Sequence, residues 1–181
     1  MIGFDMMTTA DQKLAYFLDL EPEVDDFRSA VIEGLSSAQK WVPPKFFYDA
    51  EGSKLFDKIC DLDEYYVTRT ELFLLNTHGE EIGSCIGPRA RIIEYGCGSS
   101  LKIRALLDAL NDPTDYVAID ISREHLRMTA EGIAVDYPSL SVGAVCADFS
   151  MRLDLPERQE SSAGRTVAFF PGSTIGNQIP S

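Results

Sequence analysis

The chain has 181 residues, 45% of them hydrophobic and 25% charged, a composition typical of one folded domain and not of a disordered chain. Its formal net charge is -13 and its lysines and arginines are scattered singly, which argues against nucleic acid as a partner because such binding needs clustered cations. No run of about 18 apolar residues is present, so we expect neither a membrane span nor a membrane partner, and we expect a cytoplasmic monomer.

The N-terminal third is predicted to be largely helical. Residues 1–22 are polar apart from the patch "LAYFLDL" and are compatible with a helix or a mobile arm. Apolar residues at intervals of three and four then predict an amphipathic helix, at Val24, Phe27, Val31 and Leu35. The prolines of "VPPKFFYDAEGS" end it, and a second helix is expected near 53–60 with Ser53 as its N-cap. "EYYVTRTELFLLNTHGEEIGSCI" predicts an aromatic turn, a helix over 68–76 and a short further helical piece.

After Pro88 the pattern changes to short apolar runs rich in strand-forming residues. Four such runs each lead into Gly, Asp or Pro: "ARIIEY", "DYVAID", "SVGAVCAD" and "TVAFFPG". Helical stretches over 100–111 and 122–136 separate the first three, whereas the polar connection "SMRLDLPERQESSAGR" predicts a loop. Buried strands that alternate with helices indicate right-handed βαβ units, so we predict an α/β fold with about four parallel strands.

The first strand runs into a glycine-rich loop. Ligands of open α/β sheets bind at the carboxyl ends of the strands, so these ends form the candidate site. The loop contains Glu94, Gly96 and Gly98, and Ser99 or Ser100 can cap the next helix, whose free N–H groups favour an anion. A turn that only connects a strand to a helix is the alternative interpretation.

Acidic residues end the next two strands. Asp120 lies 22 residues after Gly98, where nucleotide-binding sheets place an acid against ribose hydroxyls; capping of the helix near Ser122 is the alternative. Asp148 and Phe149 can accept a hydrogen bond from an exocyclic amine and pack against a heterocycle; a strand-end turn with a core phenylalanine is the alternative. Because a glycine loop, an acid and an acid–aromatic pair seldom coincide on three consecutive strand ends, the set predicts a nucleoside-containing ligand.

Other cofactor classes fit the sequence less well. The dinucleotide pattern G-x-G-x-x-G needs glycine where this chain has Leu101, and the Walker pattern is absent. The potential metal-binding cysteines and histidines are few: Cys60, Cys85, Cys97, Cys146, His78 and His125. They include no C-x-x-C pair, so we predict no metal site. The remaining pattern, E-x-G-x-G with acids downstream, resembles S-adenosylmethionine-dependent methyltransferases of the Rossmann-like class.

Five segments carry a closer resemblance: "PPKFFYDAEGSKLFDKICDLDEYYVTRTE", "EYGCGSSLKIRALLDAL", "VAIDIS", "ADF" and "FFPGSTIGN". Together they resemble the histidine-specific N-alpha-methyltransferase family of the ergothioneine pathway, to which fungal tryptophan-derivative N-methyltransferases are related. The similarity runs from Val42 to Asn177, and "EYYVTRTE" and "PGSTIGN" are its most specific parts. The resemblance implies a partial Rossmann-like methyltransferase domain over 88–181, preceded by a helical region over 1–87 that contributes to the substrate site.

The resemblance also implies site residues. S-adenosylmethionine contacts are implied for five positions: Gly96, Lys102, Asp120, Asp148 and Phe149. Substrate contacts, with L-histidine as the amino acid, are implied for Tyr65 and Asn177, with Tyr48 and Gly172 as weaker neighbours. Lys102 would face the cofactor carboxylate, unless it is an exposed helix lysine, and Tyr65 can alternatively serve packing. No catalytic acid or nucleophile is expected, because the leaving thioether needs no protonation.

The chain also departs from the family pattern. Ile103, Val67 and Gln178 stand where threonine, proline and an aromatic residue are usual. Family members continue beyond "PGSTIGN", so we expect an incomplete form of a longer enzyme that binds cofactor weakly and leaves "TVAFFPG" as an exposed edge strand. We do not expect this form to turn over. Two alternatives stay open: a methyltransferase of another amino acid or small amine, and a non-catalytic cofactor-binding fragment.

Overall fold

The computed structural model describes residues 14–21, 27–47, 50–158, 164–172 and 174–177. Its elements, in chain order, are β1 (Tyr16–Asp19), α1 (Phe27–Ser36), η1 (Pro44–Phe47), α2 (Ala50–Cys60), α3 (Val67–Ile86), β2 (Arg91–Tyr95), α4 (Leu101–Ala109), β3 (Asp115–Asp120), α5 (Arg123–Asp136), β4 (Ser141–Cys146), β5 (Thr166–Phe169) and η2 (Thr174–Asn177). The predicted α/β fold with a parallel sheet is confirmed.

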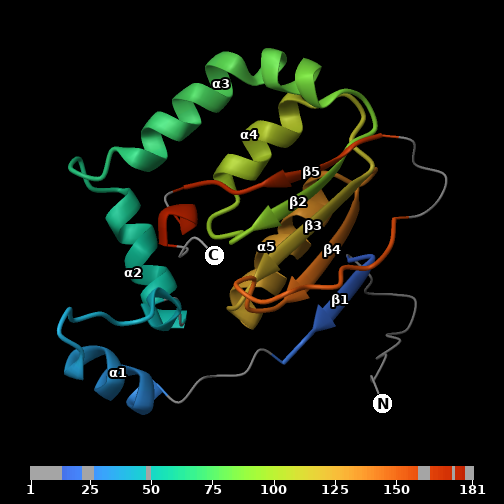
Figure 1. Cartoon of the computed structure of the whole chain (residues 1–181). Helices are drawn as coiled ribbons and strands as arrows, with labels where there is room; N and C mark the ends of the chain where they lie inside the picture. Colours follow the sequence, from blue (N-terminus) through green and yellow to red (C-terminus); the bar gives the residue numbers. More distant parts are fainter. Residues whose placement is uncertain (1–13, 22–26, 48–49, 159–163, 173, 178–181) are drawn as a thin grey trace, which may run out of the picture.

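The five strands form one sheet in the order β1-β4-β3-β2-β5, and every pairing is parallel. The chain moves outward from β2 through β3 to β4, and then returns to place β5 on the other side of β2. The carboxyl ends of β2 and β5 therefore flank the point where the strand order reverses, which is where ligands bind in open α/β sheets. Figure 1 shows α2 and η1 beyond these carboxyl ends. β5 pairs only with β2 among the described residues, as expected of an edge strand.

Strand β1 corrects the expectation of a helix or arm over residues 1–22. It pairs with β4, from Tyr16 opposite Gly143 to Asp19 opposite Cys146. A Cβ at Gly143 would lie 2.1 Å from Cζ of Tyr16, so the missing side chain at Gly143 is what admits the tyrosine ring. The strand is formed by this tertiary pairing, which the local pattern of "LAYFLDL" does not reveal.

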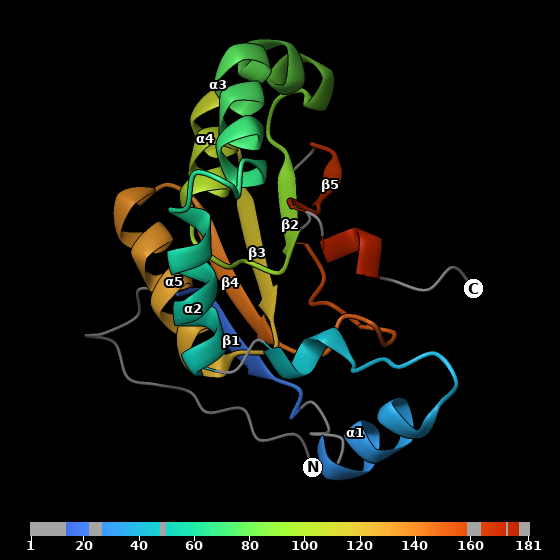
Figure 2. The ribbon, with the colours of Figure 1, turned by 90° about the vertical axis from the view of Figure 1, so that its left-hand side faces the viewer.

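Helices α3, α4 and α5 cover one face of the sheet (Figure 2). The main core lies beneath them and includes Ile92, Ile103, Tyr116, Leu126 and Ile133, all fully buried. The helices predicted over 100–111 and 122–136 are confirmed as α4 and α5. The apolar faces of these helices pack against the strand side chains that point toward them, and this side of the sheet holds the larger of the two core clusters.

Two details of the N-terminal helices differ from expectation. α3 is a single helix of 20 residues, not a helix followed by a short piece. Its internal glycines pack against α4, since a Cβ at Gly79 would lie 2.9 Å from Cβ of Ala109, and one at Gly83 would lie 2.2 Å from the Ala109 carbonyl oxygen. The second helix begins at Ala50, three residues before the predicted N-cap, so Ser53 lies inside α2.

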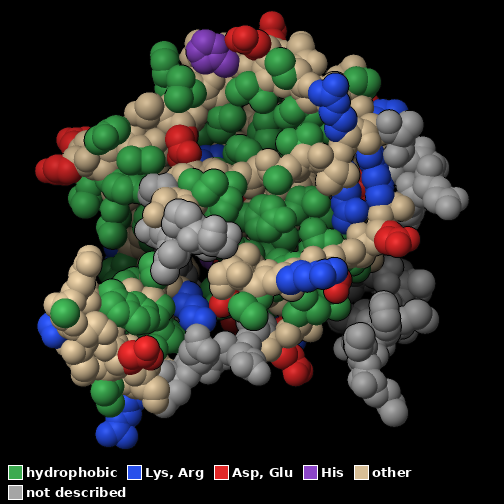
Figure 3. Space-filling view, in the orientation of Figure 1, with side chains coloured by type: hydrophobic (Ala, Val, Ile, Leu, Met, Phe, Trp, Pro, Cys, Tyr) green, Lys and Arg blue, Asp and Glu red, His purple; other side chains and the backbone are tan. Residues whose placement is uncertain are grey.

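The connection after β4 covers the other face of the sheet. As predicted, its described residues form no helix or strand. Leu153 and Leu155 from this connection pack against Val117, Ile119 and Val145, which point away from the helices. The space-filling view shows hydrophobic side chains on both sides of β5, toward α3 and toward this connection (Figure 3).

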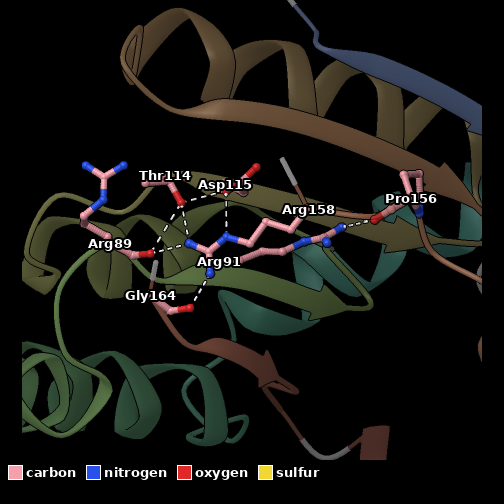
Figure 4. A network of polar contacts seen from close by, with 7 residues as sticks. All are labelled: Arg89, Arg91, Thr114, Asp115, Pro156, Arg158 and Gly164. Atoms are coloured by element: carbon pink, nitrogen blue, oxygen red, sulfur yellow. Dashed lines mark hydrogen bonds and ion pairs between the residues drawn. The ribbon is translucent and has the colours of Figure 1, made fainter. Parts of the chain in front are cut away.

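Two arginines fasten this connection to the amino ends of the strands (Figure 4). Arg158 donates to the Arg89 and Gly164 carbonyl oxygens and, at 2.8 Å, to Oγ1 of Thr114. Arg91 donates to the Pro156 carbonyl oxygen at 2.8 Å. This network lies at the opposite end of the sheet from the reversal point, so it anchors the fold and leaves the carboxyl ends open. Within the described part of the chain, no helix has the length and apolar character needed to cross a bilayer.

Candidate functional site

A cleft of about 550 Å³ lies at the carboxyl ends of the strands. Its walls come from the glycine loop after β2, the ends of β3 and β4, the turn after β5, and the segments around η1, α2 and α3. Its volume lies within the range of small-molecule and cofactor sites. All five residues predicted to contact the cofactor line it, together with Tyr65 and Gly172 from the predicted substrate group.

The glycine loop forms one wall of the cleft. Gly96 has φ +78° and Gly98 has φ +37°, in the region that other residues rarely adopt. The Gly96 N–H donates to the Ile119 carbonyl oxygen at 2.9 Å, which ties the loop to β3. Nε2 of His125, on α5, lies 2.8 Å from the Gly98 carbonyl oxygen and holds the other end of the loop. The backbone is thus fixed with no side chain between it and the cleft at these two positions.

Asp120 closes the floor of the cleft at the end of β3. Its Oδ1 accepts a hydrogen bond from the Ser122 N–H at 2.9 Å. Ser122 is the N-cap residue of α5, so Asp120 stabilises the turn before the helix and is not its cap. The Sγ of Cys97 lies 3.7 Å from its Oδ2. Burial raises the pKa of Asp120, while the hydrogen bond from Ser122 and the nearby His125 act in the opposite direction. The Asp120 carboxylate can therefore stabilise this turn and still present an oxygen to the cleft.

Glu94 lies beneath the loop and is almost fully buried, with 1% of its surface exposed. Tyr116 donates a hydrogen bond to its Oε2. Burial raises the pKa of Glu94 to about 8, and the Asp120 carboxylate adds to the rise. With a pKa of about 8, raised mainly by burial and further by the nearby Asp120 carboxylate, Glu94 is mainly protonated at neutral pH.

Asp148 and Phe149 follow β4 on the far wall. Oδ2 of Asp148 pairs with Nζ of Lys45 at 3.1 Å, and Oδ1 accepts hydrogen bonds from the Ser150 N–H and hydroxyl. Burial raises the pKa of Asp148, but the Ser150 hydrogen bonds and the Lys45 ammonium outweigh it, and the pKa stays below its usual value. The Phe149 ring packs edge-on against Tyr95 at 6.0 Å between centroids, which fixes its position at the strand ends.

Lys102 is held at the rim by a residue of α3. Its ammonium forms an ion pair with Oε2 of Glu71, and the other oxygen of Glu71 accepts a hydrogen bond from the Gly172 N–H at 2.6 Å. The Lys102 side chain is only 15% exposed. It is therefore not the exposed helix lysine weighed as an alternative, and it lies beside the turn that follows β5.

The predicted substrate residues are only partly within the described structure. Tyr65 lies in the turn between α2 and α3, and its ring packs edge-on against Phe56 at 5.8 Å, with both residues on the cleft wall. Gly172 lies on the same wall with φ +78°. Asn177 ends η2, but its side chain is not among those described, and Tyr48 lies outside the described residues.

Three charged or polar residues that support the cleft were not predicted from the sequence: Lys45 and His125 line it, and Glu71 contacts two residues that do. Lys45 and Glu71 pair with predicted site residues, and His125 supports the glycine loop. Lys45 and Glu71 occur inside the segments that carry the family resemblance, and that position is the only signal that marks them. Among the described residues, no group of three or more His, Cys, Asp or Glu side chains is placed to hold a metal ion.

Comparison with known proteins gives a consistent family assignment. Residues 27–181 match the family model described as "Histidine-specific methyltransferase, SAM-dependent". A "Histidine N-alpha-methyltransferase" of Mycolicibacterium smegmatis is 40% identical over 171 residues, which cover 92% of this chain and 51% of the relative. That of Mycobacterium tuberculosis is 40% identical over 157 residues, covering 84% and 47%. "Ergothioneine biosynthesis protein 1" of Neurospora crassa is 32% identical over 139 residues, covering 75% and 16%.

These matches confirm the resemblance predicted from the motifs. The chain spans about half the length of the two mycobacterial relatives.

Proposed function

The chain belongs to the histidine-specific, S-adenosylmethionine-dependent methyltransferase family, and from this membership we propose that its cleft binds S-adenosylmethionine and serves methyl transfer to the α-amino group of L-histidine. One observation carries the proposal: three consecutive strand ends contribute a glycine loop, an acid and an acid–aromatic pair to a single cleft. The names of the mycobacterial relatives support histidine as the substrate.

The chemistry of the cleft residues fits the cofactor. The Lys102 ammonium suits a carboxylate, and the Asp120 carboxylate suits the paired hydroxyls of a ribose. Asp148 offers an acceptor for the exocyclic amine of adenine, and the Phe149 ring offers a flat apolar contact. Gly96 has φ +78° and leaves the loop backbone accessible to a ligand. We propose these five residues as the cofactor-binding set.

The substrate part of the proposal rests on Tyr65 and Gly172, which line the same cleft. We assign the Tyr65 hydroxyl to the polar end of the amino acid, with its ring held by packing against Phe56. Asn177 and Tyr48 complete the proposed substrate group on the basis of the family motifs. In this arrangement the amino acid approaches from the region over 1–87, whose described elements are helices and strand β1, and residues 88–181 carry the cofactor.

The proposed reaction needs orientation more than acid–base groups. The cofactor would supply a methyl group on a positively charged sulfur. The neutral amine would form a C–N bond to the methyl carbon as the C–S bond breaks and its electron pair stays on sulfur. The methylated ammonium could then release its proton to water, and the thioether would leave without protonation. The role of the cleft residues is to hold the amine in line and exclude water, and such alignment can contribute roughly 7–11 kcal/mol.

Further parts of the proposal concern partners and location. We propose that the chain acts on a free amino acid, without nucleic acid or membrane partners, as a monomer in the cytoplasm. The net charge of -13 disfavours a polyanionic partner.

The direct test is methyl transfer by the purified chain. The chain is incubated with S-adenosylmethionine and L-histidine, or with other amino acids and small amines, and products are identified by mass spectrometry. Methylated histidine that is absent with Asp120→Ala supports the proposal. Methylation of another amine only would replace the proposed substrate, and cofactor binding without any product would favour a non-catalytic binding role.

A further inference from the structure

We propose that Glu71 is a positioning residue that holds Lys102 ready for the cofactor carboxylate and, through Gly172, joins the cofactor side of the cleft to the substrate side. This inference deepens the proposed function and rests on it.

The geometry places one carboxylate at the junction of three separate elements. Glu71 comes from α3, Lys102 from the first turn of α4, and Gly172 from the turn after β5. Oε2 of Glu71 pairs with the lysine ammonium, while Oε1 accepts the Gly172 N–H at 2.6 Å. Both oxygens are therefore used, and each fixes a residue of the proposed site.

The lysine needs such a restraint because two other acids, Glu94 and Asp120, line the same cleft. Burial raises the pKa of Glu94, and the Lys102 ammonium acts against this rise, so the charge already influences the buried floor. Without Glu71, the flexible lysine would be free to turn toward the Asp120 carboxylate, or toward Glu94, whose ionised form its charge favours. Glu71 instead keeps the ammonium at the rim, with donors left for a carboxylate ligand.

The second oxygen of Glu71 sets the turn that leads to Asn177. Gly172 has φ +78°, and a Cβ at this position would lie 3.3 Å from Nζ of Lys102. The lysine thus packs directly against the turn, and the hydrogen bond to Glu71 holds the two together. The next described element along the chain is η2, which ends at the proposed substrate residue Asn177.

Two effects of removing Glu71 have opposite signs, which makes the proposal testable. Loss of a negative charge beside Lys102 would by itself strengthen the binding of an anionic ligand group. Loss of the restraint would weaken it, and only for ligands that carry a carboxylate. We infer that the restraint dominates.

The test compares S-adenosylhomocysteine with 5′-methylthioadenosine, which lacks the amino acid end. Calorimetric titration of the full chain is done for the wild type, Glu71→Ala, Glu71→Gln and the control Glu80→Gln, an exposed residue of the same helix. We expect both Glu71 variants to bind S-adenosylhomocysteine about tenfold more weakly, roughly 1.4 kcal/mol, with unchanged affinity for 5′-methylthioadenosine. Unchanged or tighter binding of S-adenosylhomocysteine by both variants would overturn the proposal.

Amide hydrogen exchange tests the link to Gly172 separately. Glutamine at 71 keeps an oxygen that can accept the Gly172 N–H, whereas alanine does not. The Gly172 amide should therefore exchange faster in Glu71→Ala and stay protected in Glu71→Gln; equal protection in all forms would overturn the link.

The titrations also separate this inference from the proposed function. If the wild type binds neither compound, the proposed function itself fails. If the Glu71 variants lose equal affinity for both compounds, Glu71 has only a structural role.

Discussion

Tyr116 on β3 donates a hydrogen bond to the Glu94 carboxylate on the adjacent strand β2, and both side chains are buried beneath the glycine loop. The pair places an ionisable acid inside the floor of the cleft, with Asp120 close enough to raise its pKa further. The acid therefore links the stability of the fold to pH.

We predict that Glu94 makes the chain less stable as pH rises. Burial raises its pKa from 4.5 to about 8, so between these values the unfolded chain releases a proton that the native chain keeps. The free energy of unfolding then falls with pH, by at most about 1.4 kcal/mol per unit from this group. Glu94→Gln, which still accepts from Tyr116, should flatten the fall in urea unfolding between pH 5 and 8. The exposed Glu124→Gln should not, and equal slopes for Glu94→Gln and the wild type would contradict the prediction.

Close packing between α3 and α4 gives a second prediction. Gly83→Ala should lower the free energy of unfolding by about 1–3 kcal/mol, because the new Cβ would lie 2.2 Å from the Ala109 carbonyl oxygen. Alanine normally favours a helix interior by about 1 kcal/mol over glycine, so packing and propensity oppose each other here. Urea unfolding decides between them. If Gly83→Ala were more stable than the wild type, α3 and α4 would be able to move apart without loss of stability, and the prediction would be wrong. Ser84→Ala, on the exposed side of α3, is the matched control.

The glycine loop gives a third prediction with an internal control. Gly96→Ala forces a side chain into a backbone with φ +78°, at a cost of about 1–2 kcal/mol, and should weaken S-adenosylhomocysteine binding. Gly132→Ala lies in α5, where a Cβ would meet its nearest neighbour, Nη2 of Arg104, at an ordinary 3.7 Å. That variant should be more stable by about 0.5–1 kcal/mol and bind normally. Calorimetry on both variants checks this, and normal binding by Gly96→Ala would exclude the loop from the site.

Asp148 gives a fourth prediction, on the base of the cofactor. If its carboxylate accepts a hydrogen bond from the exocyclic amine of adenine, the inosine analogue of S-adenosylhomocysteine should bind about 10–100-fold more weakly, because a carbonyl would face the acid. In Asp148→Asn the side-chain amide can donate a hydrogen bond to the carbonyl of the inosine analogue, so the difference in affinity between the two compounds should become smaller. Competitive titration measures it, and equal affinity of the wild type for both compounds would remove Asp148 from base recognition.

The strands of the βαβ units were predictable because their signals are local. Continuous apolar runs that end in Gly96, Asp120 and Asp148 indicate buried parallel strands, and topology alone brings their carboxyl ends to one edge. The position of the cleft follows from that arrangement without knowledge of side-chain positions. Strand β1 was not predictable, since it depends on Gly143, more than a hundred residues away, to admit the Tyr16 ring.

The supporting residues of the site were missed for the same reason. Glu71 and Lys45 acquire their roles only when helices from the N-terminal region fold over the strand ends, and neither residue shows a spacing pattern with its partner. The continuity of α3 was missed because glycine ordinarily disfavours a helix interior, whereas here Gly79 and Gly83 are required for contact with Ala109.

The most direct measurement is calorimetric titration of the full chain with S-adenosylhomocysteine, beside Asp120→Ala and the exposed control Asp154→Ala. We predict saturable binding by the wild type and by the control, and loss of binding in Asp120→Ala, with circular dichroism showing that all three are folded. A folded wild-type chain that does not bind, or an Asp120→Ala variant that binds as well as the wild type, would contradict the assignment of this cleft as the cofactor site.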